Sequence, residues 1–364
     1  MASCPFACPR CSGVFMHKDE SPMSQKKSLA SLGEFGFIDR IAASARNGLG
    51  VVTGIGDDAA VTALSPGMQL LTSTDMLLED VHFRRAWHDP YRLGRKSLAV
   101  NISDLAAMGS IPRWATLSLA IPAGLSLEFL EQFTQGFLAM AAEHGVSLVG
   151  GDTCSSRGGL AISVTIMGEQ FPDRILRRSG ARPEDDIWVT GTLGDAALGL
   201  NLLEKKLPFP EGVGWGEGEN VLLISRLLDP TPRVSAGLAL AESGLVTAMI
   251  DVSDGLLADF GHIAEMSGVG GTLRMQDFPV SEAFHGLAAT MDSYPWHCLV
   301  AGGEDYELAF TASPANREKI AGIMKNCGIK AMPVGIVTSL PEVKVVMPDG
   351  TCWQPQNRGY NHFS

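Results

Sequence analysis

Long apolar runs are missing from this sequence, although 45% of its 364 residues are hydrophobic. None approaches the length of a membrane span, and the N-terminus has no apolar core of the kind that a secretory signal peptide requires. Basic residues are also few. The chain has 28 lysines and arginines and 40 aspartates and glutamates, which gives a net charge of −12. We therefore expect a globular cytoplasmic protein with no membrane contact, and its acidity argues against a nucleic-acid partner.

Cysteine is also scarce: the chain has seven, an odd number and mostly scattered, as in proteins of a reducing compartment. Cys4, Cys8 and Cys11 are clustered, and their C-x3-C-x2-C spacing would suit three ligands of an iron–sulfur cluster or of a zinc site. We favour the alternative that residues 1–27 form a disordered N-terminal extension, because this segment has few apolar residues on which to fold.

Three motifs of common enzyme classes are absent. The sequence has no Walker A pattern G-x-x-x-x-G-K-[ST] and no protein-kinase motif set, so a nucleotide would have to be held in another way. It also has no G-x-S-x-G, which argues against a serine hydrolase. The length of the chain suggests two domains, each with its own core.

The stretch from Leu70 to Ser110 contains the first candidate site. Residues 69–74 alternate apolar and hydroxyl side chains as a half-buried strand does, and we expect the strand to stop at Asp75. A helix should begin after Asp89, which can cap it, with Pro90 in the first turn. The apolar face of this helix is formed by Leu93, Leu98, Ile102 and Leu105.

Asp104 interrupts this apolar face, together with Asn101 and Ser103. An ionised carboxylate among apolar neighbours is costly unless it is paired or binds a metal, so Asp104 requires a cation nearby. For Asp104 taken alone, the alternative is a surface acid or an ion pair with Arg95 or Lys96.

Strands and helices alternate through the rest of the chain, which is typical of a mixed α/β protein. The polar stretch 171–185 looks like a connection between two domains. The expected strands cover residues 114–121, 146–153, 160–168, 186–191, 246–250 and 271–275. The expected helices cover residues 28–45, 126–144, 195–203, 221–228, 233–243, 256–267 and 282–290.

Further acids lie in glycine-containing or hydroxyl-containing turns, and their order repeats. Residues 101–105 are followed by Gly150-Gly151-Asp152, and the similar residues 251–255 are followed by Gly302-Gly303-Glu304. This repeated order of motifs would be explained by two halves with a similar structure, whose acids face each other across a cleft. Because each motif is short, a coincidence of turn-forming residues is the competing explanation.

Six aspartates share these positions at turns and element ends. Carboxylates in such numbers cannot share a small volume without divalent cations, and oxygen ligands suit Mg²⁺ or Ca²⁺ better than zinc. Mg²⁺ also binds phosphate oxygens, so a nucleoside triphosphate would complete the site and phosphoryl transfer is the favoured reaction. The six are Asp58, Asp75, Asp104, Asp152, Asp251 and Asp254.

These motifs resemble those of the thiamine-monophosphate kinase family in the aminoimidazole-ribonucleotide synthetase superfamily. The matching segments occur in the family's order and span residues 32–363. They are GIGDDAAV, STDMLLEDVHF, LAVNISDLAAMGS, VGGDT, DVSDGLLADFGHI, AGGEDYEL and GYNHF.

The resemblance implies an α/β (α+β) fold of two domains with mixed sheets flanked by helices. The first domain would cover residues 28–170 and bind metal and ATP, and the second would cover residues 171–364 and complete the ATP and substrate site. The first domain would also pair with its twin in a homodimer. The implied reaction is direct transfer of the ATP γ-phosphate to thiamine monophosphate, which gives thiamine diphosphate with the help of several Mg²⁺ ions.

The resemblance also assigns roles to individual residues, matched motif by motif. The metal ligands would be Asp58, Ser73, Thr74, Asp75, Asp104, Asp152, Asp251 and Asp254. We take Asp75, Asp104, Asp152 and Asp254 as the catalytic set. ATP would contact Gly151, Asp152, Arg178 and Ser253, with Arg177 as a competitor for the role of Arg178. Thiamine monophosphate would contact His82, Glu304 and Phe363.

Two other functions compete with this one, and three positions depart from the family pattern. Another enzyme of the superfamily would use a similar acid-rich ATP site, whereas a sensor that binds without turnover would have less need of several metal ions. Asp80 stands where the family commonly has glycine, Cys154 where it has threonine, and Asn361 where it has aspartate. These departures bear on substrate fit more than on the type of reaction.

Overall fold

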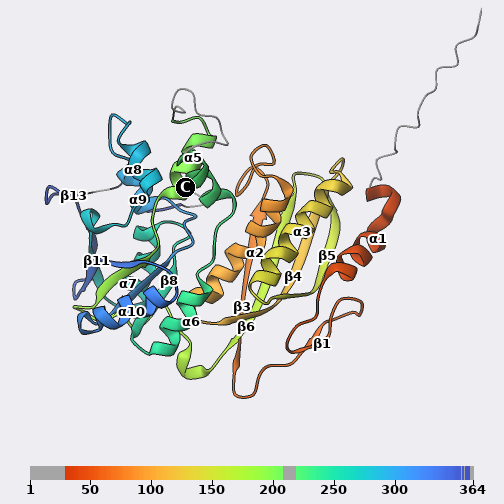
Figure 1. The fold of residues 1–364 in the computed structure, drawn as a ribbon, viewed down its shortest axis with the longest axis horizontal. Helices are drawn as coiled ribbons and strands as arrows, with labels where there is room; N and C mark the ends of the chain where they lie inside the picture. The colour runs from red at the N-terminus through yellow and green to blue at the C-terminus, as the bar shows by residue number, and fades with distance from the viewer. Residues whose placement is uncertain (1–28, 208–218, 354, 356, 361–364) are drawn as a thin grey trace, which may run out of the picture.

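The computed structural model of the chain describes residues 29–207, 219–353, 355 and 357–360 (Figure 1). The cysteine cluster at residues 4–11, Asn361 and Phe363 lie outside these described residues. The described chain forms two sheets with helices packed on them, together with a small hairpin of β1 (Val51–Thr53) and β2 (Val61–Thr62).

The first sheet has four strands in the order β3-β6-β4-β5. Two long helices, α2 (Pro90–Ala107) and α3 (Leu127–Glu143), pack against each other and against one face of this sheet (Figure 1). Strands β3, β6 and β4 pair antiparallel, whereas β4 and β5 pair parallel. The strands are β3 (Gln69–Leu78), β4 (Ile111–Pro122), β5 (Ser147–Ser156) and β6 (Ala161–Gln170). Helix α1 (Leu29–Ser44) precedes them, with Gly33 at φ +72° inside it.

The second sheet has seven strands in the order β13-β12-β9-β11-β7-β10-β8 and is antiparallel except where β12 pairs with β9. Helices lie on both of its faces (Figure 1). The strands are β7 (Asp186–Thr190), β8 (Val246–Asp251), β9 (Gly270–Arg274), β10 (Leu308–Ala312), β11 (Ala331–Thr338), β12 (Val343–Val346) and β13 (Cys352–Trp353). The helices are α4 (Asp195–Leu203), α5 (Glu219–Leu228), α6 (Val234–Ser243), α7 (Leu256–Ser267), α8 (Glu282–Ala288), α9 (Trp296–Ala301) and α10 (Arg317–Asn326).

The C-terminal end of α2 holds the two halves of the molecule together. Ala106 and Ala107 of α2 are buried in one cluster with Trp188 and Phe310 of the second sheet, whose rings stack at 5.9 Å. The backbones come very close there, because a Cβ atom on Gly237 of α6 would lie 2.1 Å from the Ala106 carbonyl oxygen. This tight contact sets the position of α2 relative to both sheets.

The mixed α/β class and the flanking helices predicted from the sequence are confirmed. Helix α2 begins as predicted, since the Asp89 carboxylate accepts a hydrogen bond from the Arg92 amide at 2.9 Å. The predicted end of the first strand is wrong, because β3 continues past Asp75 to Leu78. Its partner β6 is long enough to pair with every residue of β3, so the ladder does not stop at the acid.

The similar structure of two halves suggested by the repeated order of motifs is also wrong. Residues 101–105 lie inside helix α2, whereas residues 251–255 form the end of β8 and the turn into α7. The two sheets differ in strand number and order. The repeated order of residues therefore does not reflect a shared local structure, although acids from both halves do face one cleft.

Candidate active site

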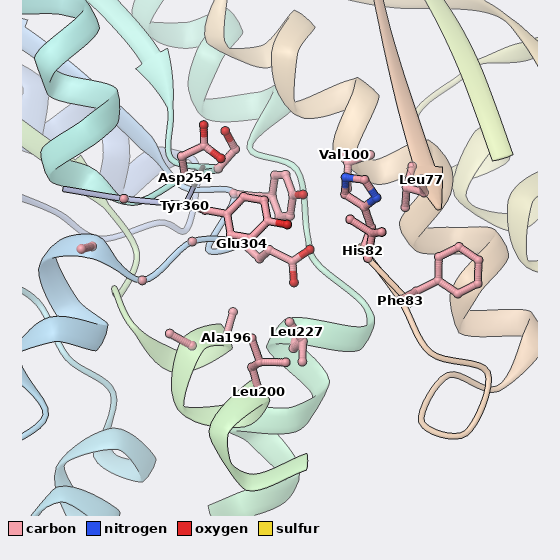
Figure 2. Close-up of a pocket in the computed structure, with 18 of the residues that line it drawn as sticks. Leu77, His82, Phe83, Val100, Ala196, Leu200, Leu227, Asp254, Glu304 and Tyr360 are labelled. Carbon is pink, nitrogen blue, oxygen red and sulfur yellow. The ribbon is translucent and has the colours of Figure 1, made fainter. Parts of the chain in front are cut away.

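A cleft of about 990 Å³ lies where the first sheet and α2 meet the second sheet (Figure 2). At one end it is lined by oxygen-bearing side chains from both halves. Thr74 and Asp75 come from β3 and Asp104 from α2, while the end of β8 and the following turn contribute the rest. Those are Asp251, Ser253 and Asp254.

The polar residues of α2 fix the positions of acids on neighbouring elements. Asp104 Oδ2 accepts a hydrogen bond from Ser73 Oγ at 2.5 Å. Asn101 Oδ1 accepts from the Asp75 amide at 3.0 Å, and Ser103 Oγ donates to Asp251 Oδ2 at 2.7 Å. These three contacts explain why polar residues interrupt the apolar face of the helix. The alternative that Asp104 pairs with Arg95 or Lys96 is not observed, since both bases bind other acids.

The turn after β8 is organised by Asp259, which the sequence analysis missed. One carboxylate oxygen of Asp259 accepts hydrogen bonds from the amides of Ser253, Asp254 and Gly255 at 3.0–3.1 Å. Gly255 has φ +116°, and a Cβ atom there would lie 2.7 Å from the Ala301 carbonyl carbon. The sequence does mark this role, because Asp259 is an acid in the first turn of the helix that begins after Gly255.

Burial and mutual repulsion raise the pKa values of the clustered acids. The pKa of Asp75 rises to about 6, first because of burial and then because of the charges of Asp104 and Asp254. The pKa of Asp251 rises to about 7, first through burial and then through Asp104. Burial also raises the pKa of Asp104, although Ser73 and Arg178 act in the opposite direction. The cluster is therefore stabilised by added positive charge.

The donor atoms of this cluster fit a hard divalent cation. They are carboxylate and hydroxyl oxygens, which Mg²⁺ prefers. Within the described part of the chain, no three or more His, Cys, Asp and Glu side chains are grouped closely enough to hold a metal ion by themselves. Such a set is not required for Mg²⁺, because this ion commonly uses one or two carboxylates together with water and substrate phosphates.

Five of the predicted site residues that the structure describes are not among those that line this cleft: Asp58, Ser73, Gly151, Asp152 and Arg178. Asp58 is exposed in the turn after β1, and its amide donates to Asp57. Asp152 is exposed on β5. Gly151 lies against β4, where a Cβ atom would be 1.9 Å from the Leu117 carbonyl oxygen, so this position requires glycine.

Arg178 is better placed than Arg177 to meet an anion near the acids. The guanidinium of Arg178 lies close enough to Asp104 to oppose the rise of that pKa. The guanidinium of Arg177 instead donates to the Ile175 carbonyl oxygen at 3.2 Å. This difference favours Arg178, although both side chains are exposed.

The other end of the cleft is more apolar. His82 and Phe83 approach from the side of the first domain, and Glu304 and Tyr360 from the opposite side (Figure 2). His82 Nδ1 accepts a hydrogen bond from the Leu78 amide at 3.0 Å. Apolar or aromatic wall residues at this end include Trp87, Leu200 and Leu227.

The loop that carries Glu304 has an unusual backbone. Glu304 has φ +69° and Tyr306 φ +49°, a region that side chains other than glycine adopt at a cost. The loop is held by hydrogen bonds from the Glu304 amide to the Ser253 carbonyl at 2.7 Å and from the Tyr306 amide to the Val252 carbonyl at 2.9 Å. Asp80, before His82, has φ +66°, which explains why a glycine would suit that position.

The C-terminal segment lies against the same turn. The Tyr360 amide donates to the Asp254 carbonyl at 3.0 Å, and a Cβ atom on Gly359 would lie 2.8 Å from that oxygen. Residues 357–360 therefore reach the cleft, while the predicted substrate residue Phe363 lies outside the described residues.

Two family models match the chain. The model for the AIR synthase related protein, N-terminal domain, matches residues 56–170, and the model for the C-terminal domain matches residues 182–348. The thiamine-monophosphate kinase of Salmonella typhimurium is 38% identical over 333 residues, which cover 91% of this chain and 98% of that protein.

Solved structures of similar sequence share the fold. The thiamine-monophosphate kinase from Stenotrophomonas maltophilia K279a is 39% identical, with a TM-score of 0.77 over 88% of this chain and 98% of that one. The structure of AaThiL complexed with AMPPCP and TMP is 32% identical, with a TM-score of 0.71 over 93% of this chain and all of that one. The similarity thus extends over both halves of the molecule.

Proposed function

Since the chain belongs to the thiamine-monophosphate kinases of the AIR synthase related family, we propose that it transfers the terminal phosphoryl group of ATP to thiamine monophosphate and forms thiamine diphosphate. One observation carries this function. A single cleft joins acids from both domains at one end to His82, Glu304 and apolar walls at the other. A relative of the same fold has been solved with AMPPCP and TMP bound together.

The acidic end is the place for several Mg²⁺ ions. They would be held by Ser73, Thr74, Asp75, Asp104, Asp251 and Asp254, with Asp58 and Asp152 as further ligands. Bound Mg²⁺ would neutralise phosphate charge in the transition state. Asp75, Asp104, Asp152 and Asp254 form the proposed catalytic set.

The protein groups around the phosphates act mainly by positioning. Arg178 can grip a phosphate with two parallel hydrogen bonds. Gly151 and Asp152 of β5 and Ser253 of the β8–α7 turn are the other proposed ATP contacts. Because phosphoryl transfer needs aligned donor and acceptor more than a protein nucleophile, a direct in-line route fits a site without a nucleophile motif.

The apolar end is the proposed site of the thiamine ring system. His82 and Glu304 face it from opposite sides, and Phe363 is the third proposed contact (Figure 2). A carboxylate and an aromatic face both stabilise a cationic ring. The phosphate of thiamine monophosphate would then point toward the acids, where the γ-phosphate of ATP is held.

We further propose a division into domains at residues 28–170 and 171–364, a homodimer and a cytoplasmic location. The two family models end and begin on either side of the proposed boundary. The uncovered face of β3 exposes Leu70, Met76 and Leu78, which supports pairing of two first domains. In the described part of the chain, no helix is long and apolar enough to cross a membrane.

The test is incubation of the purified protein with ATP, Mg²⁺ and thiamine monophosphate, followed by separation of the products. Thiamine diphosphate and ADP should form in equal amounts without an accumulating phosphoenzyme. Hydrolysis of ATP without thiamine diphosphate would refute the function, and a phosphorylated protein that supplies the product would refute the direct route.

A further inference from the structure

Lys96 of α2 is a fully buried base that belongs to neither end of the cleft. Its side chain is 0% exposed. Its ammonium lies 2.9 Å from the Leu227 carbonyl oxygen at the end of α5 and 2.9 Å from Glu304 Oε1. A buried charge is tolerated only when it is paired and hydrogen-bonded, so these two contacts define where Lys96 can be. Both partners belong to the second half of the molecule.

Lys96 lies behind the wall of the cleft rather than in it. The wall includes Val100, Leu227 and Glu304, but Lys96 is not among the lining residues. Lys96, Val100 and Asp104 are spaced four residues apart, so they lie on one face of α2. At 1.5 Å per residue, roughly 12 Å of helix separates Lys96 from Asp104. One helix therefore presents an acid at the phosphate end and supports Glu304 through Lys96, about two turns earlier.

The contact with Lys96 decides how Glu304 meets the cleft. The Glu304 side chain is 28% exposed, and Lys96 occupies one of its two oxygens. Glu304 also lines the cleft, and the contact with Lys96 uses only Oε1. The backbone of Glu304 is strained, and contacts must hold it there. The adjacent His88 is buried, and its pKa falls to about 3, first through burial and then through Lys96, so it stays neutral and does not compete for the carboxylate.

We propose that Lys96 is a positioning residue for thiamine monophosphate: it holds Oε1 of Glu304 so that the carboxylate faces the cationic ring system of the substrate. This inference rests on the proposed function and adds a residue that does not touch the substrate. It predicts that loss of the ammonium weakens binding of thiamine monophosphate and leaves binding of ATP unchanged.

The first test replaces Lys96 with methionine, which keeps the length of the side chain and removes its charge. The KM for thiamine monophosphate should rise about tenfold or more, while the KM for ATP stays within about twofold. Lys96→Gln can still form hydrogen bonds and should give a smaller rise. If Lys96→Met does not fold, Lys96→Gln is the variant to be measured. Equal changes in both KM values would indicate a structural role only and overturn the inference.

Arg95→Gln is the matched control. Arg95 is the next residue of α2 and also joins the two halves, since its guanidinium lies 2.8 Å from Asp229, but it does not contact Glu304. Its replacement should lower the melting temperature and leave both KM values unchanged. If Arg95→Gln shifted the KM for thiamine monophosphate as Lys96→Met does, a general loosening of the cleft would replace our explanation.

A double-mutant cycle tests the path from Lys96 through Glu304. If Lys96 acts through Glu304, Lys96→Met should raise the KM for thiamine monophosphate little further in a Glu304→Gln background. If the fold-change in KM of the double variant equals the product of the fold-changes of the two single variants, Lys96 and Glu304 act independently and the coupling is refuted. The proposed function fails separately, if the unaltered protein forms no thiamine diphosphate. An active protein whose Lys96 variants have normal KM values would refute only this inference.

Discussion

At Asp104, the local contacts show what the site requires. Its carboxylate is held by Ser73 and lies near Asp75 and Asp251, whose pKa values are raised by burial and by its charge. Replacing one of these acids with a neutral residue would increase the stability of the fold, because the repulsion between the carboxylates would be smaller. The proposed Mg²⁺ ions would explain why these acids lie together.

We predict that Asp104→Asn or Asp75→Asn lowers turnover at least about a thousandfold while the fold is retained. The substitution removes a ligand charge but little volume, so packing is kept. Steady-state rates and circular dichroism check this expectation. Rates near those of the unaltered protein in either variant would show that the acid is not a metal ligand.

The raised pKa of Asp75 predicts a pH-dependent effect of Asp75→Asn on stability in the presence of a chelator. The pKa is about 6 in the folded protein against an ordinary value of 3.8, so ionisation of Asp75 costs stability increasingly as the pH rises from about 3.8 to about 6. The variant should melt a few degrees higher than the unaltered protein at pH 8. The difference should shrink as the pH falls below 6 and vanish only near the ordinary pKa of 3.8, where Asp75 is protonated in the unfolded protein as well.

The comparison of two proteins at each pH removes the effect of other groups. Buried His88, for example, has a lowered pKa and costs stability as the pH falls below 6.5 in both proteins. A difference in melting temperature that does not change between pH 8 and pH 5 would contradict the raised pKa.

Among the elements, α2 and strands β7, β8 and β9 were largely predictable, whereas the rest of the second sheet and its strand order were not. The Asp89 cap, the proline after it and the apolar spacing are local signals, and the structure has the helix where they place it. The end of β3 depends on its partner β6, which no local pattern in β3 reveals. Similarly, the order of the seven strands depends on contacts between distant segments.

The candidate site likewise had some residues with a local signal in the sequence and others that depend on contacts with distant segments. The acids of the cleft were predicted because glycine turns and family motifs mark them. Lys96 and Asp259 were missed as functional supports, because their partners are far away in sequence or are backbone amides. A buried lysine on a helix cannot be told from a surface lysine until the opposite element is known.

The contact between α2 and α6 predicts a strong effect of a single methyl group. Gly237→Ala should lower the free energy of unfolding by about 2 kcal/mol or more, since the new Cβ would meet the Ala106 carbonyl at 2.1 Å. Gly261→Ala in α7 is the matched control, because its Cβ would meet no atom within 4 Å. The control should be neutral or slightly stabilising. Urea unfolding of both variants checks this, and equal losses would contradict it.

On the scale of the whole molecule, the cleft exists because two unlike domains are fixed to each other. The acids of α2 and β3 meet those of the β8–α7 turn only when α2 packs on both sheets. Neither domain alone contains the full set. We therefore expect activity to require the intact chain.

The proposed homodimer predicts that Leu70→Glu on the uncovered face of β3 yields monomers. Leu70 is 51% exposed, and a charge there would be buried in the pairing of two first sheets. Leu340→Glu is the control, because Leu340 is 68% exposed on the second domain. Sedimentation velocity separates the outcomes. A monomeric unaltered protein, or monomers from the control, would refute this interface.

Trp87 gives the cleft an optical reporter. Its indole lies under the guanidinium of Arg84, 4.4 Å from the ring centroid, lines the cleft and packs on the core of the second domain. Indole emission responds to polarity and to nearby charge, so occupation of the apolar end is expected to change the intrinsic fluorescence without an attached dye. The order in which the two substrates enter can then be followed by rapid mixing.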